Sequence, residues 1–346
     1  ITGLFMERNI RTISARAFYG CTNLVHLVAS GVTQIEEQAF YGCSNLIGPL
    51  PATIFTIKEQ AFHGCSSLTG EIPPALTELP KGVFYGCSKL TGEIPISVTT
   101  VGAYALYGCR GLTGPVPSIN SIPEYAFYGC SGLTGEIDTS SIKSVGRYAF
   151  AGCSRLTGAL HFEKNVEIGD FAFQGCSGFS NSLSFDISII TDSPPSTPTK
   201  IGRSAFKDCK GFKDGTLSFV VNNKEDTYTN QYTYYRFNYF LQICNNAFDN
   251  TKFKDIYYLG RFEPDCDYDI GISKIQGIHT STHYANKSFC NHPLHSDDLS
   301  AGAIAGIVIA CIVVVAAIAV LVVFLILRRR KNKPQSEEEY EMNQDP

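Results

Sequence analysis

The chain has 346 residues, of which 44% are hydrophobic, and a formal net charge of −4. A balance this close to neutral excludes the strongly basic surface by which proteins bind nucleic acid. The sequence begins at Ile1 inside a repeated unit, with no apolar signal segment before it. We therefore expect a fragment, or a chain that lacks its leader and an N-terminal cap.

One ten-residue phrase recurs along residues 1–253, in forms such as AFYGCSNLIG from Ala39 and AFYGCSGLTG from Ala126. The cysteines from Cys21 to Cys109 are each 22 residues apart, and later copies follow at 21 to 23 residues. With two looser copies near residues 205 and 247, ten units are present. A fixed period of about 20–29 residues with leucines at set offsets indicates leucine-rich repeats.

Each unit carries apolar residues at the same offsets. An aliphatic residue lies four positions before the alanine, a phenylalanine usually follows the alanine, and a leucine usually lies three positions after the cysteine. One coil cannot bury such a side, but stacked coils share a continuous core. We predict a leucine-rich-repeat solenoid of about ten coils of 22–23 residues, built from short strands plus turns or short helices. The phenylalanines should stack inside, and the glycine before each cysteine should adopt positive φ.

The repeated cysteine allows two interpretations. A free cysteine packs as a small hydrophobe, whereas coils about 4.8 Å apart are close enough for disulfide bonds. Residues of one column have parallel Cβ vectors, which is poor geometry for a bridge. We therefore predict that Cys21 through Cys176 are reduced and mostly buried, with a disulfide-bonded column as the alternative.

The position after the phenylalanine holds tyrosine in five of the first six units and His63 in the third. Because the phenylalanine belongs to the core, its successor should lie at least partly outside. The candidate ligand-binding stripe consists of Tyr19, Tyr41, Tyr85, Tyr107 and Tyr128. The alternative is a structural ladder, since stacked aromatic rings stabilise repeats without any partner.

Two insertions should interrupt the solenoid, a Pro/Ser/Thr loop at 191–200 and a segment at 213–242 that is rich in tyrosine. The aromatic residues of the second insertion form a contact surface or fold back over the solenoid flank. Residues 254–300 are interpreted as a C-terminal cap and juxtamembrane segment. Within it, Cys266 and Cys290 are disulfide candidates, and Asn286 begins the one glycosylation sequon.

Residues 303–327 are 25 consecutive apolar or glycine residues, and about 20 suffice to cross a bilayer. RRRKNK follows directly, and positive charge marks the cytoplasmic side. We predict one transmembrane α-helix at the plasma membrane, with the repeats extracellular and a cytoplasmic tail at 328–346. Gly302, Gly306 and Ala310 would share one helix face, where small residues allow a weak homodimer.

No catalytic constellation occurs in the sequence, so we predict neither an enzyme nor a cofactor. One cluster has ligand-like spacing: His279, His283, Cys290, His292 and His295. Nothing indicates a helix that would bring the first two histidines to one face. We interpret these residues as polar juxtamembrane side chains rather than as a metal site.

The unit I-x-x-x-A-F-Y-G-C-S-x-L-T resembles the BspA-like, treponemal-type leucine-rich repeat family over roughly residues 10–260. The cap IYYLG…EPDC, the apolar span and the short tail resemble membrane-anchored BspA-like surface proteins of parasitic protists. The resemblance implies a surface antigen or adhesin that binds a host or extracellular-matrix protein, a glycan or a neighbouring cell. The alternative is a receptor that signals or is endocytosed through its tail, where Tyr340 is followed three positions later by Asn343 instead of the apolar residue of a sorting signal.

Overall fold

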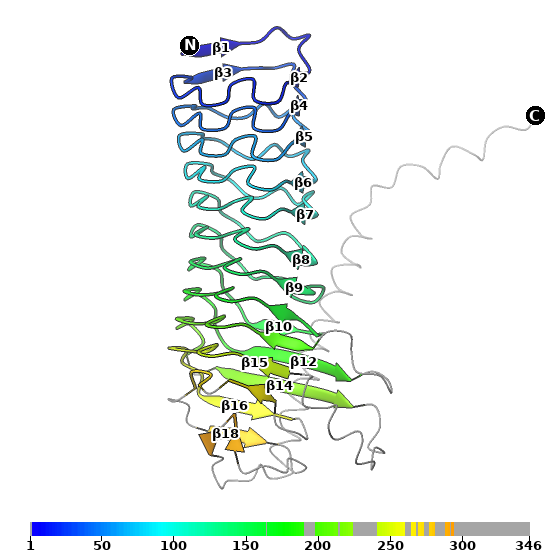
Figure 1. Ribbon diagram of the computed structural model, residues 1–346, viewed down its shortest axis with the longest axis vertical. Helices are drawn as coiled ribbons and strands as arrows, with labels where there is room; N and C mark the ends of the chain where they lie inside the picture. Colours follow the sequence, from blue (N-terminus) through cyan, green and yellow to red (C-terminus); the bar gives the residue numbers. More distant parts are fainter. Residues whose placement is uncertain are drawn as a thin grey trace, which may run out of the picture. The chain divides into compact units, whose positions relative to one another are not determined.

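The structure is a computed structural model, and it describes residues 2–163, 165–189, 198–213, 215–223, 241–259, 264–267, 269–272, 277–280, 288–290 and 292–293. The chain divides into two compact units, Ile1–Ser296 and Asp297–Pro346. All described residues belong to the first unit, which is a solenoid of stacked coils (Figure 1).

One short parallel strand from each coil forms the first face of the solenoid. These strands are β2 (Thr12–Ile13), β4 (Gln34–Ile35), β5 (Thr56–Ile57), β6 (Glu78–Leu79), β7 (Thr100–Val101), β8 (Ser121–Ile122), β9 (Ser144–Val145), β11 (Glu167–Ile168), β13 (Thr199–Ile201), β15 (Leu241–Ile243) and β17 (Asp265–Cys266). The register is constant, so that Ile13 lies beside Ile35 and Ile35 beside Ile57. The aliphatic column predicted from the sequence is buried from Ile13 to Ile243, as expected of a shared core.

The second face is a regular sheet only toward the ends of the solenoid. It comprises β1 (Gly3–Phe5) and β3 (His26–Val28), then the five parallel strands β10 (Leu160–Phe162), β12 (Leu183–Ile189), β14 (Thr216–Asn223), β16 (Asp255–Tyr258) and β18 (Gly277–Thr280). The middle coils make isolated bridges such as Glu93 with Thr113. Several middle coils read LTGEIP or LTGPVP, and proline cannot donate to a β-ladder. From Leu160 onward an alternating apolar pattern replaces that phrase, and the strands lengthen (Figure 1).

The AFxGC segments form turns, and the described residues contain no helix, so the expected choice between turns and short helices is settled as turns. Two positions of each turn have positive φ, for example 56° at Arg16 and 69° at Gly20. The backbone N–H groups of these two residues donate to the carbonyls of Glu37 and Tyr41 in the next coil, at 2.9 and 2.7 Å. Backbone groups that would bond within a helix therefore bond between coils.

The phenylalanines stack inside the solenoid as predicted. The rings of Phe40, Phe62 and Phe84 are fully buried, with successive centroids 5.1 and 5.8 Å apart. Leu106 takes the phenylalanine position in the fifth coil, and stacking resumes from Phe127 onward. The core is therefore a continuous column of side chains under the turns.

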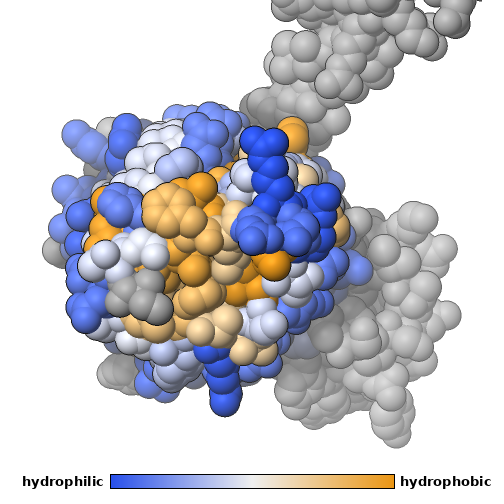
Figure 2. Space-filling view, turned by 90° about the horizontal axis from the view of Figure 1, so that it is seen from above, coloured by the Kyte–Doolittle hydropathy of each residue, from blue (hydrophilic) through white to orange (hydrophobic). Residues whose placement is uncertain are grey.

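Apolar side chains remain exposed at the N-terminal end, which Figure 2 shows from above. Phe5 is 78% exposed and Ile10 is 40% exposed. The first coil packs against a neighbour on one side only. Its apolar column is therefore open at the other side, whereas later coils bury theirs between two neighbours.

The solenoid continues beyond residue 253, where a cap was predicted. Strands β16 and β18 extend the second face, and β17 extends the first. Ile270 takes the alanine position of a further coil, because its carbonyl accepts the N–H of Phe248 at 3.0 Å, as Ala247 accepts that of Phe206. This coil lacks the AFxGC phrase, so a prediction based on that phrase placed the end of the solenoid too early, at residue 253.

Each of the two predicted insertions includes residues that belong to a strand in the structure. Residues 216–223, assigned to the insertion at 213–242, form β14 in register with β12 and β16. Residues 199–200, assigned to the insertion at 191–200, belong to β13. In residues 216–223 the buried Leu217 and Phe219 alternate with polar residues, a pattern that the repeat phrase does not include. A short antiparallel pair, β19 (Ser288–Phe289) and β20 (His292–Pro293), completes the described elements.

Candidate functional site

The tyrosine column that follows the core phenylalanines forms a continuous stack of rings along the turns. Ring-centroid distances are 4.8 Å for Tyr19–Tyr41, 4.4 Å for Tyr41–His63, 4.3 Å for His63–Tyr85, 4.4 Å for Tyr85–Tyr107 and 4.6 Å for Tyr107–Tyr128. The ring planes are nearly parallel, so each inner ring is covered on both faces. Tyr19 is 51% exposed and the other rings are half-buried. The exposed part of this first ladder is consequently its ring edges.

A second aromatic ladder runs beside the first and was not identified from the sequence. It consists of Tyr104, Tyr125, Tyr148 and Phe171, whose successive centroids lie 4.8, 5.0 and 4.6 Å apart. These residues stand two positions before the core phenylalanine or leucine. The same position in the first four units holds Arg16, Gln38, Gln60 and Gly82. Comparing only the fifth to eighth units would have shown this aromatic column.

The two ladders contact each other from the fourth to the seventh coil. The ring of Tyr107 lies 6.3 Å from Tyr104 and 6.2 Å from Tyr125, at tilts of 36° and 43°. Tyr128 meets Tyr148 edge-on at 6.1 Å. We call the ten residues of both ladders the aromatic double stripe: Tyr19, Tyr41, His63, Tyr85, Tyr107 and Tyr128 with Tyr104, Tyr125, Tyr148 and Phe171.

The second ladder stands on left-handed backbone. The φ angles of its four residues are 59°, 56°, 54° and 59°, a region that bulky residues rarely adopt. The conformation costs about 1–2 kcal/mol per residue, and each of the three stacked pairs returns about 0.5–1.5 kcal/mol. The position is left-handed in the other coils as well, where Arg16, Gln38, Gln60, Gly82, Ser204 and Asn246 occupy it. The conformation is therefore a property of the repeated turn and is not particular to the aromatic residues.

Polar side chains border the double stripe. Arg16 Nε donates to Gln38 Oε1 at 2.7 Å, and Gln38 Nε2 donates to Gln60 Oε1 at 2.6 Å, in the column where the second ladder later begins. The guanidinium of Arg147 lies 5.2 Å from the centroid of the Tyr148 ring. The double stripe is thus a neutral aromatic surface with polar and charged neighbours.

Burial sets the protonation of the double stripe. It is the main cause that raises the pKa of Tyr107, and the neighbouring phenols of Tyr85 and Tyr128 raise it further. Burial also raises the pKa of Tyr104 and lowers the pKa of His63. At neutral pH both phenols therefore keep their protons as hydrogen-bond donors, and the imidazole is neutral.

The cysteine column lies beneath the turns as reduced thiols. Eight members from Cys43 to Cys209 are buried, whereas Cys21 and Cys244 are half-exposed. Each buried Sγ donates to a carbonyl of the preceding coil, as Cys65 does to Phe40 at 3.1 Å. That carbonyl also accepts the backbone N–H of Cys43 at 3.1 Å. The thiols therefore connect successive coils.

Burial makes these thiols unsuited to chemistry. It raises the pKa of Cys43 to about 11 and that of Cys130 to about 12. The nucleophilic form of cysteine is the thiolate, which is nearly absent at neutral pH when the pKa is so high. The column is structural rather than catalytic.

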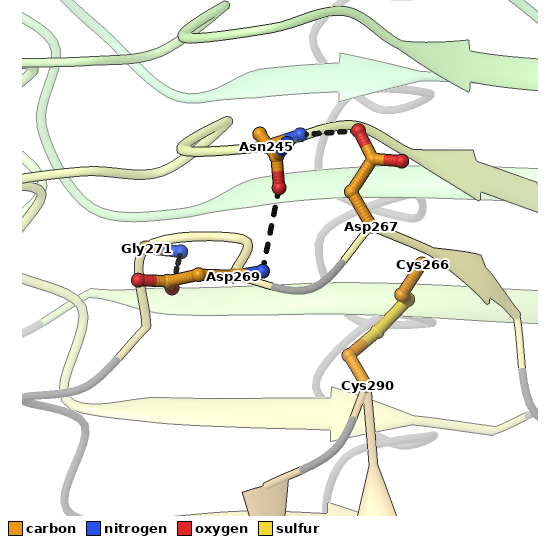
Figure 3. Close-up of a disulfide and its surroundings, with 6 residues drawn as sticks. All are labelled: Asn245, Cys266, Asp267, Asp269, Gly271 and Cys290. Atoms are coloured by element: carbon orange, nitrogen blue, oxygen red, sulfur yellow. Dashed lines mark hydrogen bonds between the residues drawn. A yellow bond between two sulfur atoms is a disulfide. The ribbon is translucent and has the colours of Figure 1, made fainter.

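Two cysteines that stand outside this column are joined to each other. Cys266 and Cys290 form a disulfide with a Cα–Cα distance of 5.3 Å (Figure 3). Cys266 ends β17 beside Ile243 of β15. The backbone N–H of Asn245 donates to Asp267 at 2.7 Å beside the bridge. The disulfide therefore ties residues 288–290 to the last coil of the first face.

The histidines of the C-terminal segment do not assemble a metal site where the structure describes them. His279 Nε2 lies 3.4 Å from Asp255 Oδ1, and its ring stacks on Tyr257 at 4.8 Å. Cys290 is bonded to Cys266 and offers no thiolate. Within the described ranges, no group of three or more His, Cys, Asp or Glu residues could hold a metal ion. His283 and His295 lie outside those ranges.

Several predicted features fall on residues that the structure does not describe. They are the sequon residue Asn286, the dimer face of Gly302, Gly306 and Ala310, the apolar span 303–327, the tail 328–346 and the aromatic segment 224–240. Among the described residues, no helix has the length and apolar character needed to cross a membrane.

The repeated coils, shared core and parallel strands define a leucine-rich-repeat solenoid. Residues 1–113 match the family model "BspA type Leucine rich repeat region" in six copies. The chain therefore belongs to the BspA-type leucine-rich repeat family. None of the curated proteins matches it.

Three solved structures are similar to this chain. A leucine-rich repeat protein of T. pallidum is 30% identical, with 45% of this chain and 78% of that chain covered and a TM-score of 0.39. A leucine-rich cell surface protein from Faecalibacterium prausnitzii is 21% identical, with coverages of 79% and 83% and a TM-score of 0.42. A leucine-rich repeat protein from Bacteroides ovatus is 22% identical, with coverages of 75% and 84% and a TM-score of 0.27.

Proposed function

We propose that this protein is a surface-displayed adhesin that binds an extracellular protein of a host, a matrix or a neighbouring cell through the aromatic double stripe. The observation that carries the proposal is the second ladder, which contacts the first and widens the aromatic surface in the middle coils. Its four rings are half-buried, so part of each ring remains accessible to a partner.

The double stripe has the properties of a protein-binding surface. Tyrosine is enriched among residues that dominate binding energy, because it combines a large area with a hydroxyl group. The rings here are already held by stacking on both sides, so little side-chain freedom remains to be lost on binding. A contiguous apolar patch of a few hundred Å² on a protein surface is often functional.

The display at the cell surface is supported by the sequence beyond the described residues. The span 303–327 anchors the chain in the plasma membrane in this proposal, and the basic residues that follow it orient the repeats outward. Asn286 would carry a glycan close to the membrane, and Gly302, Gly306 and Ala310 would allow weak pairing of two anchors.

The test displays the full chain on cultured cells and measures their attachment to surfaces coated with extracellular-matrix protein and to other cells. A triple variant, Tyr41→Ser, Tyr85→Ser and Tyr107→Ser, should lose attachment. A second triple variant with phenylalanine at the same positions keeps the stacks and removes only the hydroxyls.

The matched control changes three exposed residues outside the stripe, Glu71→Ser, Glu93→Ser and Glu136→Ser. This variant should attach as the unchanged chain does. Normal attachment of the serine stripe variant, with an unchanged melting temperature, would exclude the double stripe as the binding surface.

A further inference from the structure

We infer that the occupant of the aromatic double stripe is a polyproline II segment of a proline-rich protein, lying along the solenoid axis. This inference deepens the proposed function and rests on it. It specifies the conformation of the bound chain and the chemistry that recognises it.

The axial repeat of the stripe matches that of a polyproline II helix. The Tyr85–Tyr107 and Tyr107–Tyr128 steps measure 4.4 and 4.6 Å, so two coils advance about 9 Å. A polyproline II helix has three residues per turn and rises about 3.1 Å per residue, so one turn advances about 9.3 Å. Every third residue of the partner would therefore meet an equivalent ring edge on every second coil.

Other common partners return to this register less often. At about 4.5 Å per coil, a β-strand repeats one face about every 6.7 Å and comes back into step only every third coil. An α-helix advances about 5.4 Å per turn and comes back into step only every sixth coil. Both therefore make fewer in-step contacts than a polyproline II helix, which meets every second coil. Nucleic-acid bases stack on open ring faces, whereas the inner faces of these ladders are already covered by neighbouring rings.

The hydrogen-bonding chemistry also fits. A polyproline II helix makes no internal hydrogen bonds, so its carbonyl groups are free to accept. The phenols of the stripe can supply donors along one line, and the raised pKa of Tyr107 keeps its proton in place. Proline has no N–H group that would require an acceptor. Aromatic surfaces recognise such segments in this way elsewhere.

The area of the stripe favours a single segment over a second copy of this chain. The stripe crosses eight coils about 4.8 Å apart, so it is about 34 Å long. The rings stand two abreast only where the ladders overlap, in the fifth and sixth coils, and the stripe is one ring wide elsewhere. A standard stable interface buries about 800 Å² per partner, which so narrow a stripe does not provide. A polyproline II segment of about 11 residues would span it from end to end.

The experiment measures binding of fluorescein-labelled proline homopolymers of 6, 12 and 18 residues to the purified full chain by fluorescence anisotropy. A 12-residue Gly/Ser peptide is the flexible control. Affinity should rise from 6 to 12 residues and then level off, because about 11 residues fill the stripe. The Gly/Ser peptide should not bind.

Two sets of variants locate the site. Tyr85→Phe, Tyr107→Phe and Tyr128→Phe together should weaken binding of the 12-residue peptide about a hundredfold, since each neutral hydrogen bond contributes about fivefold. Their melting temperature should not change, because the stacks remain. The control Glu71→Ser, Glu93→Ser and Glu136→Ser should bind the peptide normally.

The outcomes separate this inference from the proposed function. If stripe-dependent cell attachment is found but the 12-residue peptide does not bind, the inference is wrong and the adhesin proposal stands. Peptide binding that survives both the variant Tyr85→Phe, Tyr107→Phe and Tyr128→Phe and the variant Tyr41→Ser, Tyr85→Ser and Tyr107→Ser would also overturn it. So would self-association of the chain that disappears in the stripe variants, because a second copy would then be the occupant.

Discussion

Replacing Phe84 by alanine tests whether the phenylalanine column supports the solenoid. The Phe84 ring is fully buried and stacks on Phe62 at 5.8 Å. Its N–H donates to Ala105 at 2.9 Å, and its carbonyl accepts Cys109 Sγ at 3.1 Å. These bonds fix the spacing between neighbouring coils, so the coils cannot move together easily to fill the cavity that the ring leaves. We expect a loss of about 3–5 kcal/mol in the free energy of unfolding.

Two further variants calibrate that loss. Phe84→Leu should cost less than about 1.5 kcal/mol, because Leu106 already fills the same position in the next coil and is fully buried. Phe55→Ala makes the same chemical change at a phenylalanine that is 51% exposed. A surface change of this kind should stay within about 0.5 kcal/mol.

Guanidinium denaturation followed by circular dichroism measures the three losses. Hydrogen exchange shows where they act, because the stability of a repeat protein combines each coil with its contacts to its neighbours. Protection should fall first in the coils on either side of Phe84. A loss below about 1 kcal/mol, or one equal to that of Phe55→Ala, would show that the column is not the core.

Other measurements test the thiols and the stripe. Unfolded thiols ionise near pH 8.5, while the folded pKa of Cys109 is far higher. The free energy of unfolding should therefore fall by about 1.4 kcal/mol per pH unit per buried thiol above about pH 9, and an unchanged slope in Cys109→Ala would contradict this. In the native chain, a thiol reagent should label Cys21 and Cys244 long before the eight buried cysteines; equal labelling rates would argue against the buried column. Burial lowers the pKa of His63, so the unfolded chain binds its proton more readily and the melting temperature should fall as the pH drops below about 6.5. His63→Tyr should reduce that fall, and an identical pH profile in the variant would show that the imidazole does not cause it.

The parts of the fold that the sequence predicts are those that repeat. The column of Ile13 and Ile35 recurs in coil after coil, so its burial and its strand follow from one stacking rule. The positive φ of Gly20 follows in the same way. The end of the solenoid was placed too early because Ile270 keeps the backbone register of the alanine column without its motif.

The first aromatic ladder was predicted from the sequence, whereas the second was missed. Tyr85 and Tyr107 are consecutive members of a visible column, and the core position of their neighbours implies that they lie outside. Tyr104 and Tyr125 were missed because glutamine and glycine occupy their position in earlier units. Tyr104 and Tyr125 lie close to Tyr107 because their backbone has left-handed φ angles. A tyrosine in a sequence does not indicate that conformation.

The bond from Cys65 Sγ to the Phe40 carbonyl recurs between the same two positions of other neighbouring coils, and so do the backbone bonds of the turns. A genetic exchange that removes or adds one whole 22-residue unit therefore leaves no donor or acceptor without a counterpart. The register between neighbouring coils is preserved, so the fold tolerates variation in the number of repeats. Each unit gained or lost lengthens or shortens the surface by one coil. Length variants of this gene should thus differ in the reach of their binding surface while sharing one core.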